Sequence, residues 1–314
     1  METFHNKQGY KRIFKENKLT LGLFIPIEAY SGSIPSMEKH IQMAQKAEEL
    51  GFGALWVRDI PLFDPYFGDV GQIYDPWIYL GYLTAHTKKI TLGTGSIVFP
   101  LRHPIHLAKA ATSIDQLSKG RLVLGIASGD RQVEFPAFNI NIPSRGEAFR
   151  ETYYYFKQLL NEDFPMIDSQ VGQIHRNAGV LPKPYHSSDI PLIITGSSRQ
   201  PFDWIAANGD GWMYYPRSIH QQSLSVQAWR EATSTFKPFL QSLYIDLTED
   251  PDTEPSPIHL GFRLGRKHLI HFLKSLEKIG VNHVMLNLKY GQRDAEKVME
   301  ELANEVLPHF PSFD

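Results

Sequence analysis

Short apolar runs alternate with longer amphipathic segments along most of the 314-residue chain. A nearly continuous apolar run, such as residues 19–26, is typical of a strand that is buried on both faces of a parallel sheet. Strand-sized runs of this kind recur along the whole sequence. We predict strands at residues 19–26, 54–57, 90–98, 121–127, 191–195, 211–215, 242–247 and 283–287.

Amphipathic helices are predicted between these strands. In the first of them Ser36 stands at the expected N-cap, apolar residues follow at helical spacing, and Gly51 ends the pattern. The other intervals have a similar character. We predict helices at residues 36–51, 76–86, 104–117, 149–160, 201–208, 221–235, 269–276 and 294–307.

This alternation predicts an α/β protein, a closed (β/α)8 TIM barrel with loop insertions. A closed barrel is favoured over an open doubly wound sheet because it leaves no strand edge exposed. We expect a single domain over residues 1–314, with a long loop at 130–145 and an insertion at 161–190 that forms a small hairpin. Residues 249–257 are acidic and rich in proline, and we expect a mobile loop there that acts as a lid.

The composition is that of a soluble globular protein. Apolar residues make up 42% and charged residues 21% of the chain, and the net charge of −2 argues against a nucleic-acid partner. Without cysteine there is neither a disulfide framework nor a thiol nucleophile. No apolar run reaches the ~20 residues that cross a bilayer, and the N-terminal stretch lacks the apolar core of a signal peptide. We therefore expect a cytoplasmic protein with no membrane partner.

Glycine and hydroxyl residues gather where the predicted strands end. Residues 94–96, 128–129 and 195–199 all lie at the end of a strand or directly after one. In a barrel, these ends form the functional face. The pattern suits a flat, hydrogen-bonding ligand that lies close to the backbone.

Residues 195–199, Thr-Gly-Ser-Ser-Arg, connect a strand to a helix. Backbone N–H groups and the helix dipole favour an anion at such a junction, Gly196 allows close approach of the backbone, and Arg199 adds a positive charge. The alternative is an ordinary junction with Ser198 as the N-cap of the helix. Because the neighbouring strand ends are also rich in glycine and serine, we favour a phosphate site.

Other ligand motifs are incomplete. The glycines of the third strand lack the last glycine of a dinucleotide fingerprint, because Val98 stands in its place. There is no Gly-x-Ser-x-Gly elbow and no lysine after a Walker-type glycine loop. His103 and His106, like His268 and His271, have the spacing of metal ligands but no third ligand nearby in the sequence. We expect no metal site.

Residues 91–104 and 117–129 resemble the bacterial luciferase-like monooxygenase family, and the resemblance extends in collinear order through residues 138–160 and 193–212. The chain is most similar to the family's flavin oxidoreductases of unassigned substrate. The resemblance implies a (β/α)8 barrel that holds reduced flavin at the carboxyl ends of its strands. It also implies a non-prolyl cis peptide at Gly95–Ser96.

The resemblance further implies which residues contact the cofactor. Arg145 matches an arginine implicated in phosphate contact, and residues 196–198 match the family's phosphate turn. The implied cofactor is reduced FMN, with F420 as the alternative. Taken together with the strand ends, the expected cofactor-binding residues are Thr94, Gly95, Ser96, Ser128, Gly129, Arg145, Thr195, Gly196, Ser197, Ser198 and Arg199.

The chain departs from the luciferases at the catalytic base. Luciferases carry a Glu-His-His run after the second strand, where this sequence reads Asp59-Ile60-Pro61, so their catalytic histidine is missing. Asp59, His103 and Arg131 are candidates by position, and a structural ion pair or helix cap is the alternative for each. We expect the walls of a dry pocket at Phe63, Tyr66, Phe67, Phe99, Trp212 and Tyr214.

Three functions remain open. We favour a monooxygenase that uses FMNH2 and O2 on a small organic substrate and receives its flavin from a separate reductase, as in a two-component system. The second is an F420-dependent dehydrogenase or reductase of the same superfamily, for which Arg199 and Arg217 offer basic contacts. The third is a non-catalytic flavin-binding barrel that acts through its partners. Relatives imply a homodimer.

Overall fold

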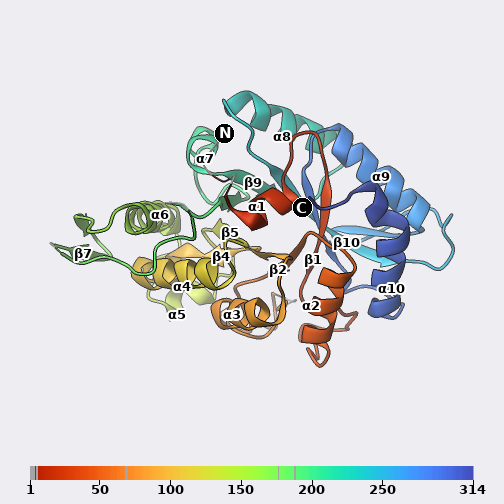
Figure 1. Cartoon of the computed structure of the whole chain (residues 1–314), viewed down its shortest axis with the longest axis horizontal. Coiled ribbons are helices and arrows are strands. Elements are labelled where there is room, and N and C mark those ends of the chain that lie inside the picture. The colour runs from red at the N-terminus through yellow and green to blue at the C-terminus, as the bar shows by residue number, and fades with distance from the viewer. Residues whose placement is uncertain (1–3, 5, 68–69, 176, 187–188, 314) are drawn as a thin grey trace.

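The computed structural model describes residue 4 and residues 6–67, 70–175, 177–186 and 189–313. Among these residues, eight parallel strands close into a barrel that helices surround, so the predicted (β/α)8 fold is confirmed (Figure 1). The barrel strands are β1 (Thr20–Phe24), β2 (Ala54–Val57), β3 (Thr91–Thr94), β5 (Leu122–Ala127), β8 (Leu192–Thr195), β9 (Gly211–Tyr214), β10 (Phe239–Leu247) and β13 (His283–Asn287).

The barrel closes because strands from the two ends of the chain pair with each other. β1 pairs with both β13 and β2, and β10 pairs with both β13 and β9. Parallel pairing continues from β2 through β3, β5 and β8 to β9. Every barrel strand therefore has a neighbour on each side, and all carboxyl ends meet at one mouth.

The helices pack their apolar faces on the outside of the strands in one continuous core. They are α2 (His40–Glu49), α3 (Pro76–His86), α4 (Pro104–Leu117), α6 (Arg145–Asn161), α7 (Phe202–Asn208), α8 (Ile219–Ala232), α9 (Arg266–Lys278) and α10 (Ala295–Glu301). Within the described residues, no helix has both the length and the apolar character to span a bilayer.

Shorter elements join or extend the main ones. The strands among them are β4 (Ile97–Val98), β6 (Ile167–Ser169), β7 (Gly172–Ile174), β11 (Ser256–Ile258) and β12 (Gly261–Leu264). The short helices are α1 (Gln8–Ile13), α5 (Glu134–Ala137), η1 (Phe99–Leu101), η2 (Leu302–Val306) and η3 (Leu307–His309). The long loop expected at residues 130–145 thus contains α5.

Helix α1 lies against the amino-terminal end of the barrel. Gly9 N donates to Gly120 O (2.9 Å), and Thr91 Oγ1 donates to Gly9 O (2.9 Å). A Cβ on Gly9 would lie only 2.3 Å from the carbonyl oxygen of Arg121, so this close approach requires glycine. The helix closes the end of the barrel opposite the mouth.

The barrel interior contains one buried polar chain among apolar side chains. Trp56 Nε1 donates to His283 Nε2 (3.0 Å), and Thr20 Oγ1 lies 2.7 Å from His283 Nδ1. Burial lowers the pKa of His283 to about 3, so the imidazole is neutral and its Nδ1–H donates to Thr20. Thr20 Oγ1 in turn donates to Ile13 O (2.7 Å). Every group in this chain is satisfied without water.

The start of α2 differs from the prediction. Ser36 does not cap the helix, which begins at His40 and has no side-chain cap. Instead Ser36 donates from its backbone N (2.6 Å) and from Oγ (3.1 Å) to the Glu28 carboxylate. Ser36 Oγ also accepts from Glu38 N (3.3 Å), so the serine braces the turn before the helix.

The insertion at residues 161–190 contains the expected hairpin, formed by antiparallel pairing of β6 with β7. The hairpin projects from the side of the barrel beyond α6 (Figure 1). It leaves the order of the barrel strands unchanged, since β5 pairs directly with β8.

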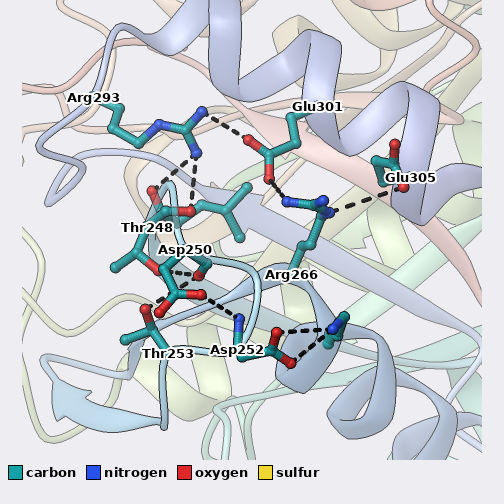
Figure 2. A network of polar contacts seen from close by, with 10 residues as sticks. Thr248, Asp250, Asp252, Thr253, Arg266, Arg293, Glu301 and Glu305 are labelled. Carbon is teal, nitrogen blue, oxygen red and sulfur yellow. Dashed lines mark hydrogen bonds and ion pairs between the residues drawn. The ribbon is translucent and has the colours of Figure 1, made fainter.

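The segment expected to be a mobile loop, residues 249–257, begins at a network of ion pairs (Figure 2). Arg293 donates to the carbonyl of Thr248 (3.1 Å) and pairs with Glu301 (2.7 Å). Arg266 pairs with the same carboxylate (3.1 Å). These contacts fasten the start of the segment to α9 and α10, and the mobility of the rest of it stays a prediction.

One buried ion pair generates a prediction about stability. Lys7 Nζ lies 2.5 Å from Asp115 Oδ2, and both side chains are fully buried. Replacing Lys7 by alanine leaves a buried carboxylate without its cation, which typically costs about 3–5 kcal/mol. We expect urea unfolding of Lys7→Ala to show a loss of that size, whereas the exposed Lys11→Ala on α1 loses less than ~0.5 kcal/mol. Equal losses in the two variants would contradict the assignment.

Candidate functional site

A cavity of about 460 Å³, hereafter the mouth cavity, opens where β2, β3, β5 and β8 end. It adjoins an inner cavity of about 140 Å³ at the centre of the barrel. Both are lined by Arg58, Gly95, Thr195 and Tyr215. Phe24, Met213 and Met285 also line the inner cavity, which is therefore largely apolar.

Nearly all the predicted cofactor residues meet at the mouth cavity. Those that line it are Gly95, Ser96, Ser128, Gly129, Arg145, Thr195, Gly196, Ser197, Ser198 and Arg199. Thr94 does not line it, because its side chain is buried and Oγ1 donates to Gly125 O (2.7 Å). Thr94 therefore joins two neighbouring strands, β3 and β5. The two residues that follow it, Gly95 and Ser96, line the cavity.

The peptide bond Gly95–Ser96 is cis, as expected. Ser96 Oγ is hydrogen-bonded to Thr195 Oγ1, which also lies 3.7 Å from Met213 Sδ. Gly95 N donates to Val57 O (2.7 Å). The hydroxyl contact joins the ends of β3 and β8, and the backbone bond joins β3 to β2. Both hydroxyl groups lie beside the mouth cavity.

The turn of residues 196–199 has an unusual backbone. Gly196, Ser198 and Arg199 have φ values of +58°, +43° and +58°. Such left-handed conformations at non-glycine residues cost free energy and persist only where surrounding contacts enforce them. Ser198 Oγ donates to Thr195 O (2.8 Å), so the serine braces the turn. It is not the N-cap of α7, which begins at Phe202 after Pro201.

The turn presents unused backbone donors. Gly196 N donates to Met213 O (2.8 Å), whereas the N–H groups of Ser197 and Ser198 have no acceptor in the part of the chain that the structure describes. The side chain of Ser197 is exposed. A Cβ on Gly196 would meet no atom within 4 Å, so any side chain there would enter open space. Successive N–H groups in such a turn form an anion-binding concavity.

Gln200 ties this turn to the start of α6, a role that sequence analysis did not predict. Its Nε2 donates to Gly146 O (2.7 Å) and Ser198 O (3.0 Å), while Oε1 accepts from Arg150 Nε (2.8 Å). Trp212 Nε1 holds the other side of the turn by donating to Gly196 O (2.8 Å). Trp212 was expected in a pocket wall, but it supports the turn from behind.

Two arginines supply positive charge at this end of the mouth cavity. Arg145 opens α6, and its guanidinium donates to Ile142 O (2.8 Å). Its Nε is buried and has no hydrogen-bond partner among the described residues. Burial, and next the charge of Arg199, lower the pKa of Arg145. Two cations that line one cavity, together with the free N–H groups of the turn, favour an anion.

The three candidates for a catalytic base have different surroundings. Asp59 lines the mouth cavity, but its carboxylate accepts from Arg102 Nε (3.0 Å), Arg102 Nη2 (2.7 Å) and Val98 N (3.1 Å). Arg131 also lines the cavity, with its guanidinium 4.1 Å from the centroid of the Phe67 ring. His103 caps α4 by accepting from Ile105 N (3.3 Å) and does not line the cavity.

Some of the residues that we expect in the pocket walls line a cavity, and others do not. Phe67 lines the mouth cavity and Tyr214 the inner one. Phe99 is fully buried in the core against Phe149 and Phe156, so its assignment to a wall is wrong. Phe63 and Tyr66 line neither cavity, whereas Arg58 and Tyr215 line both and were not predicted. Whether an aromatic residue faces core or cavity depends on side-chain direction, which composition does not give.

The histidine pairs do not form a metal centre with other ligands. In the part of the chain that the structure describes, no three His, Asp or Glu side chains are grouped so that they could hold a metal ion. Donors at the mouth cavity are instead N–H, hydroxyl and guanidinium groups. These suit a phosphate group and the hydrogen-bonding edges of a flat ring system.

Sequence comparison finds distant relatives. Over 170 residues the chain is 28% identical to the alkanal monooxygenase alpha chain of Photorhabdus luminescens, a match that covers 54% of this chain and 45% of that protein. The chain thus matches less than half the length of this relative.

Two solved structures share the fold over most of the chain. A monooxygenase, RslO1 from Streptomyces bottropensis, superposes with a TM-score of 0.77 at 18% identity, covering 93% of this chain and 99% of its own. An F420-dependent secondary alcohol dehydrogenase in complex with an F420-acetone adduct gives a TM-score of 0.76 at 18% identity, with the same coverage.

The family of luciferase-like monooxygenases matches residues 19–242, which span the barrel from β1 into β10 and include every residue that lines the mouth cavity. Because this match covers most of the chain, the protein belongs to the luciferase-like monooxygenase family.

Proposed function

We propose that this protein binds reduced FMN in the mouth cavity and uses it with O2 to oxygenate a small organic substrate. The observation that carries the proposal is the turn of residues 196–199, which has two N–H groups without an acceptor among the described residues and lines the same cavity as Arg145. A doubly charged phosphate matches this donor set better than a carboxylate does, since it offers more acceptor oxygens.

The rest of the mouth cavity also suits a flavin. Gly95 and Gly129 both line the cavity, so no side chain stands between their backbone and a ligand there. The hydroxyls of Ser96 and Thr195 offer hydrogen bonds to the polar edge of a ring. A volume of about 460 Å³ lies within the usual range of cofactor pockets.

In this proposal the protein binds the flavin, orients its ring and shields the ring from water. When bound, reduced FMN supplies the electrons that activate O2. Arg145, Arg199 and the turn hold the phosphate end, while Phe67 and Tyr214 exclude water from the ring end. Asp59 is engaged by Arg102, so we assign it no proton transfer. Reduced flavin is supplied by a separate reductase, in a two-component system.

F420 is the second candidate cofactor, because the fold does not distinguish the two chemistries. The RslO1 monooxygenase and the F420-dependent dehydrogenase superpose on this chain almost equally well, with TM-scores of 0.77 and 0.76. F420 has an acidic tail that needs further basic contacts beyond the phosphate. Arg217 lines neither the mouth cavity nor the inner cavity, and this favours FMN.

Titration of the purified chain with FMN, with FMNH2 under anaerobic conditions and with F420 tests these alternatives. We expect both redox forms of FMN to bind more tightly than F420, and we expect O2 consumption by the reduced complex to couple to oxygenation of one compound in a substrate panel. Tighter F420 binding would favour the dehydrogenase. Flavin binding without any turnover across the panel would favour a non-catalytic barrel.

Loss of either arginine should weaken FMN binding selectively. A hydrogen bond to a charged group contributes ~1.5–3 kcal/mol, so Arg145→Ala or Arg199→Ala should raise the FMN dissociation constant about 10- to 100-fold. Riboflavin lacks the phosphate and should bind both variants within about twofold of the native protein. Lys274→Ala, on an exposed part of α9, is the matched control. Equal losses for FMN and riboflavin would refute the phosphate assignment.

The chain is also proposed to form a homodimer through α3. Ile78 and Tyr82, one helical turn apart, are 76% and 48% exposed, and Tyr74 is exposed beside them against His40. An apolar patch of this kind is typical of an interface.

Light scattering should therefore give twice the 35.9 kDa of one chain. Ile78→Glu combined with Tyr82→Glu should give a folded monomer, because each substitution would place an unpaired carboxylate in the dimer interface. Leu224→Glu, at an equally exposed leucine of α8, should stay dimeric. A monomeric native protein would rule out the interface.

A further inference from the structure

Asn287 is a buried polar residue of the inner cavity that takes no part in the proposed phosphate site. It is the last residue of β13, lines the inner cavity and is only 3% exposed. Its partner in the register with β10 is Tyr244, and Met285 is paired with Ser242 two residues earlier. All four line the inner cavity, because alternate residues of a strand point to the same face. The side chain of Asn287 therefore points into the barrel.

The amide of Asn287 has one end engaged and one end unused. Lys289 N donates to Asn287 Oδ1 (3.0 Å), and this contact identifies the other end of the amide as the NH2 group. Nδ2 has no acceptor among the described residues. A buried donor without an acceptor costs free energy, so native structures almost always supply one, from protein, water or ligand. An acceptor bound in the inner cavity would satisfy this donor.

Nδ2 of Asn287 selects for an acceptor more strictly than the other uncharged polar groups here do. Those groups, among the described residues, are the hydroxyls of Thr195, Tyr214, Tyr215, Ser242 and Tyr244. A hydroxyl group can either donate or accept, so it does not discriminate between the two kinds of bound group. The NH2 group of an amide can only donate. Asn287 therefore favours a ligand that presents an oxygen acceptor.

The charge of the inner cavity favours an uncharged ligand. In the described part of the chain no carboxylate lines it, so a buried cation would have no counter-charge there. Arg58 is the one charged residue among the described lining residues, and it also lines the mouth cavity, so it stands at the junction of the two. Around Asn287 the wall is largely apolar, with Phe24 and Met285. The acceptor that suits this corner is a neutral oxygen, such as that of a carbonyl group.

The walls of the inner cavity also limit the size of a ligand. β9 pairs with β10 at residues 239–241, and β12 pairs with β10 from Tyr244 onward, so β12 extends the barrel wall where β9 has ended. The turn before β12 adds Leu260 to the lining, and Leu260 O accepts from Tyr244 N (3.2 Å). The enclosed volume is about 140 Å³. An apolar cavity of roughly 150 Å³ holds one benzene molecule, so a ring of about six or seven non-hydrogen atoms fits here.

We propose that the inner cavity is the substrate subsite and takes a compact, uncharged carbonyl compound, whose oxygen accepts a hydrogen bond from Asn287 Nδ2. This inference rests on the proposed function, because it places the substrate beside the flavin. Asn287 determines which chemical group is bound, while Leu260 and the wall formed by β12 determine how large the ligand is.

Two ligands of the same shape test the hydrogen bond. Cyclohexanone has a carbonyl oxygen where methylenecyclohexane has a CH2 group, and binding of each to the FMN-saturated protein is followed by ligand-observed NMR. Asn287→Leu should weaken cyclohexanone binding about 5- to 100-fold, because the carbonyl oxygen is then buried without a donor. Methylenecyclohexane should bind Asn287→Leu at least as tightly as the native protein. Equal changes for the two ligands would overturn the role of Asn287.

A second substitution keeps the contact with Lys289. Asn287→Asp retains the acceptor for Lys289 N and replaces the NH2 donor by an oxygen, so it should also weaken cyclohexanone binding and should gain binding of cyclohexylammonium. Asn304→Leu, at an exposed asparagine of η2, is the matched control and should bind both ring ligands as the native protein does.

The native protein alone gives two further readouts. A crystal of the FMN complex soaked with cyclohexanone should place the carbonyl oxygen about 2.9 Å from Asn287 Nδ2. Cyclododecanone, which carries the same carbonyl group on a larger ring, should not displace cyclohexanone. Displacement by cyclododecanone would overturn the size limit, and displacement of cyclohexanone by FMN would assign the inner cavity to the flavin ring and overturn the subsite.

Failure of this inference is distinguishable from failure of the proposed function. If the native protein binds cyclohexanone through Asn287 but does not bind FMN, the proposed function fails and the carbonyl site stands. If it binds FMN but does not bind cyclohexanone, or binds it equally well in Asn287→Leu, only the subsite is overturned.

Discussion

Closure of the parallel barrel is the constraint on which the site depends. Because β1 is paired with β13 as well as with β2, none of the eight barrel strands has a free edge, and their carboxyl ends meet at the same rim. That requirement brings Gly95, Ser128 and Thr195 to one cavity although they are far apart in the chain. The helices and α1 stabilise the closed form from outside and from the opposite end, but the shared rim itself comes from backbone pairing.

At the rim, the most constrained feature is the turn of residues 196–199. Its left-handed residues would be unstable in isolation, and three side chains enforce them: Ser198 from within, Trp212 from β9 and Gln200 toward α6. The result is a turn whose own hydrogen bonds leave two N–H groups available. A preorganised donor set of this kind binds an anion with little loss of conformational entropy, because the turn is already ordered.

The sequence predicted most of the fold and most of the candidate site, for identifiable reasons. β2 has its predicted bounds because a buried parallel strand needs a continuous apolar run. α3 and α4 have theirs because helices that pack on the sheet need apolar residues at helical spacing. Predictions failed where a side chain bonds to a group from another segment of the chain. Ser36 bonds to Glu28 in place of capping α2, and Thr94 bonds to Gly125 in place of facing the cavity. Such choices depend on residues that are distant in sequence and near only after folding.

By itself, the sequence determined the alternation of strands and helices, the strand ends that carry glycine and hydroxyl groups, and the resemblance that pointed to Gly95–Ser96 and Arg145. Each of these is encoded in local spacing or in a collinear motif. Only the tertiary structure decided that Asp59 is held by Arg102, that Gln200 braces the turn, and that Asn287 lines the inner cavity. The physical reason is that burial and partner choice are properties of the packed chain, set by which distant groups the closed barrel brings together.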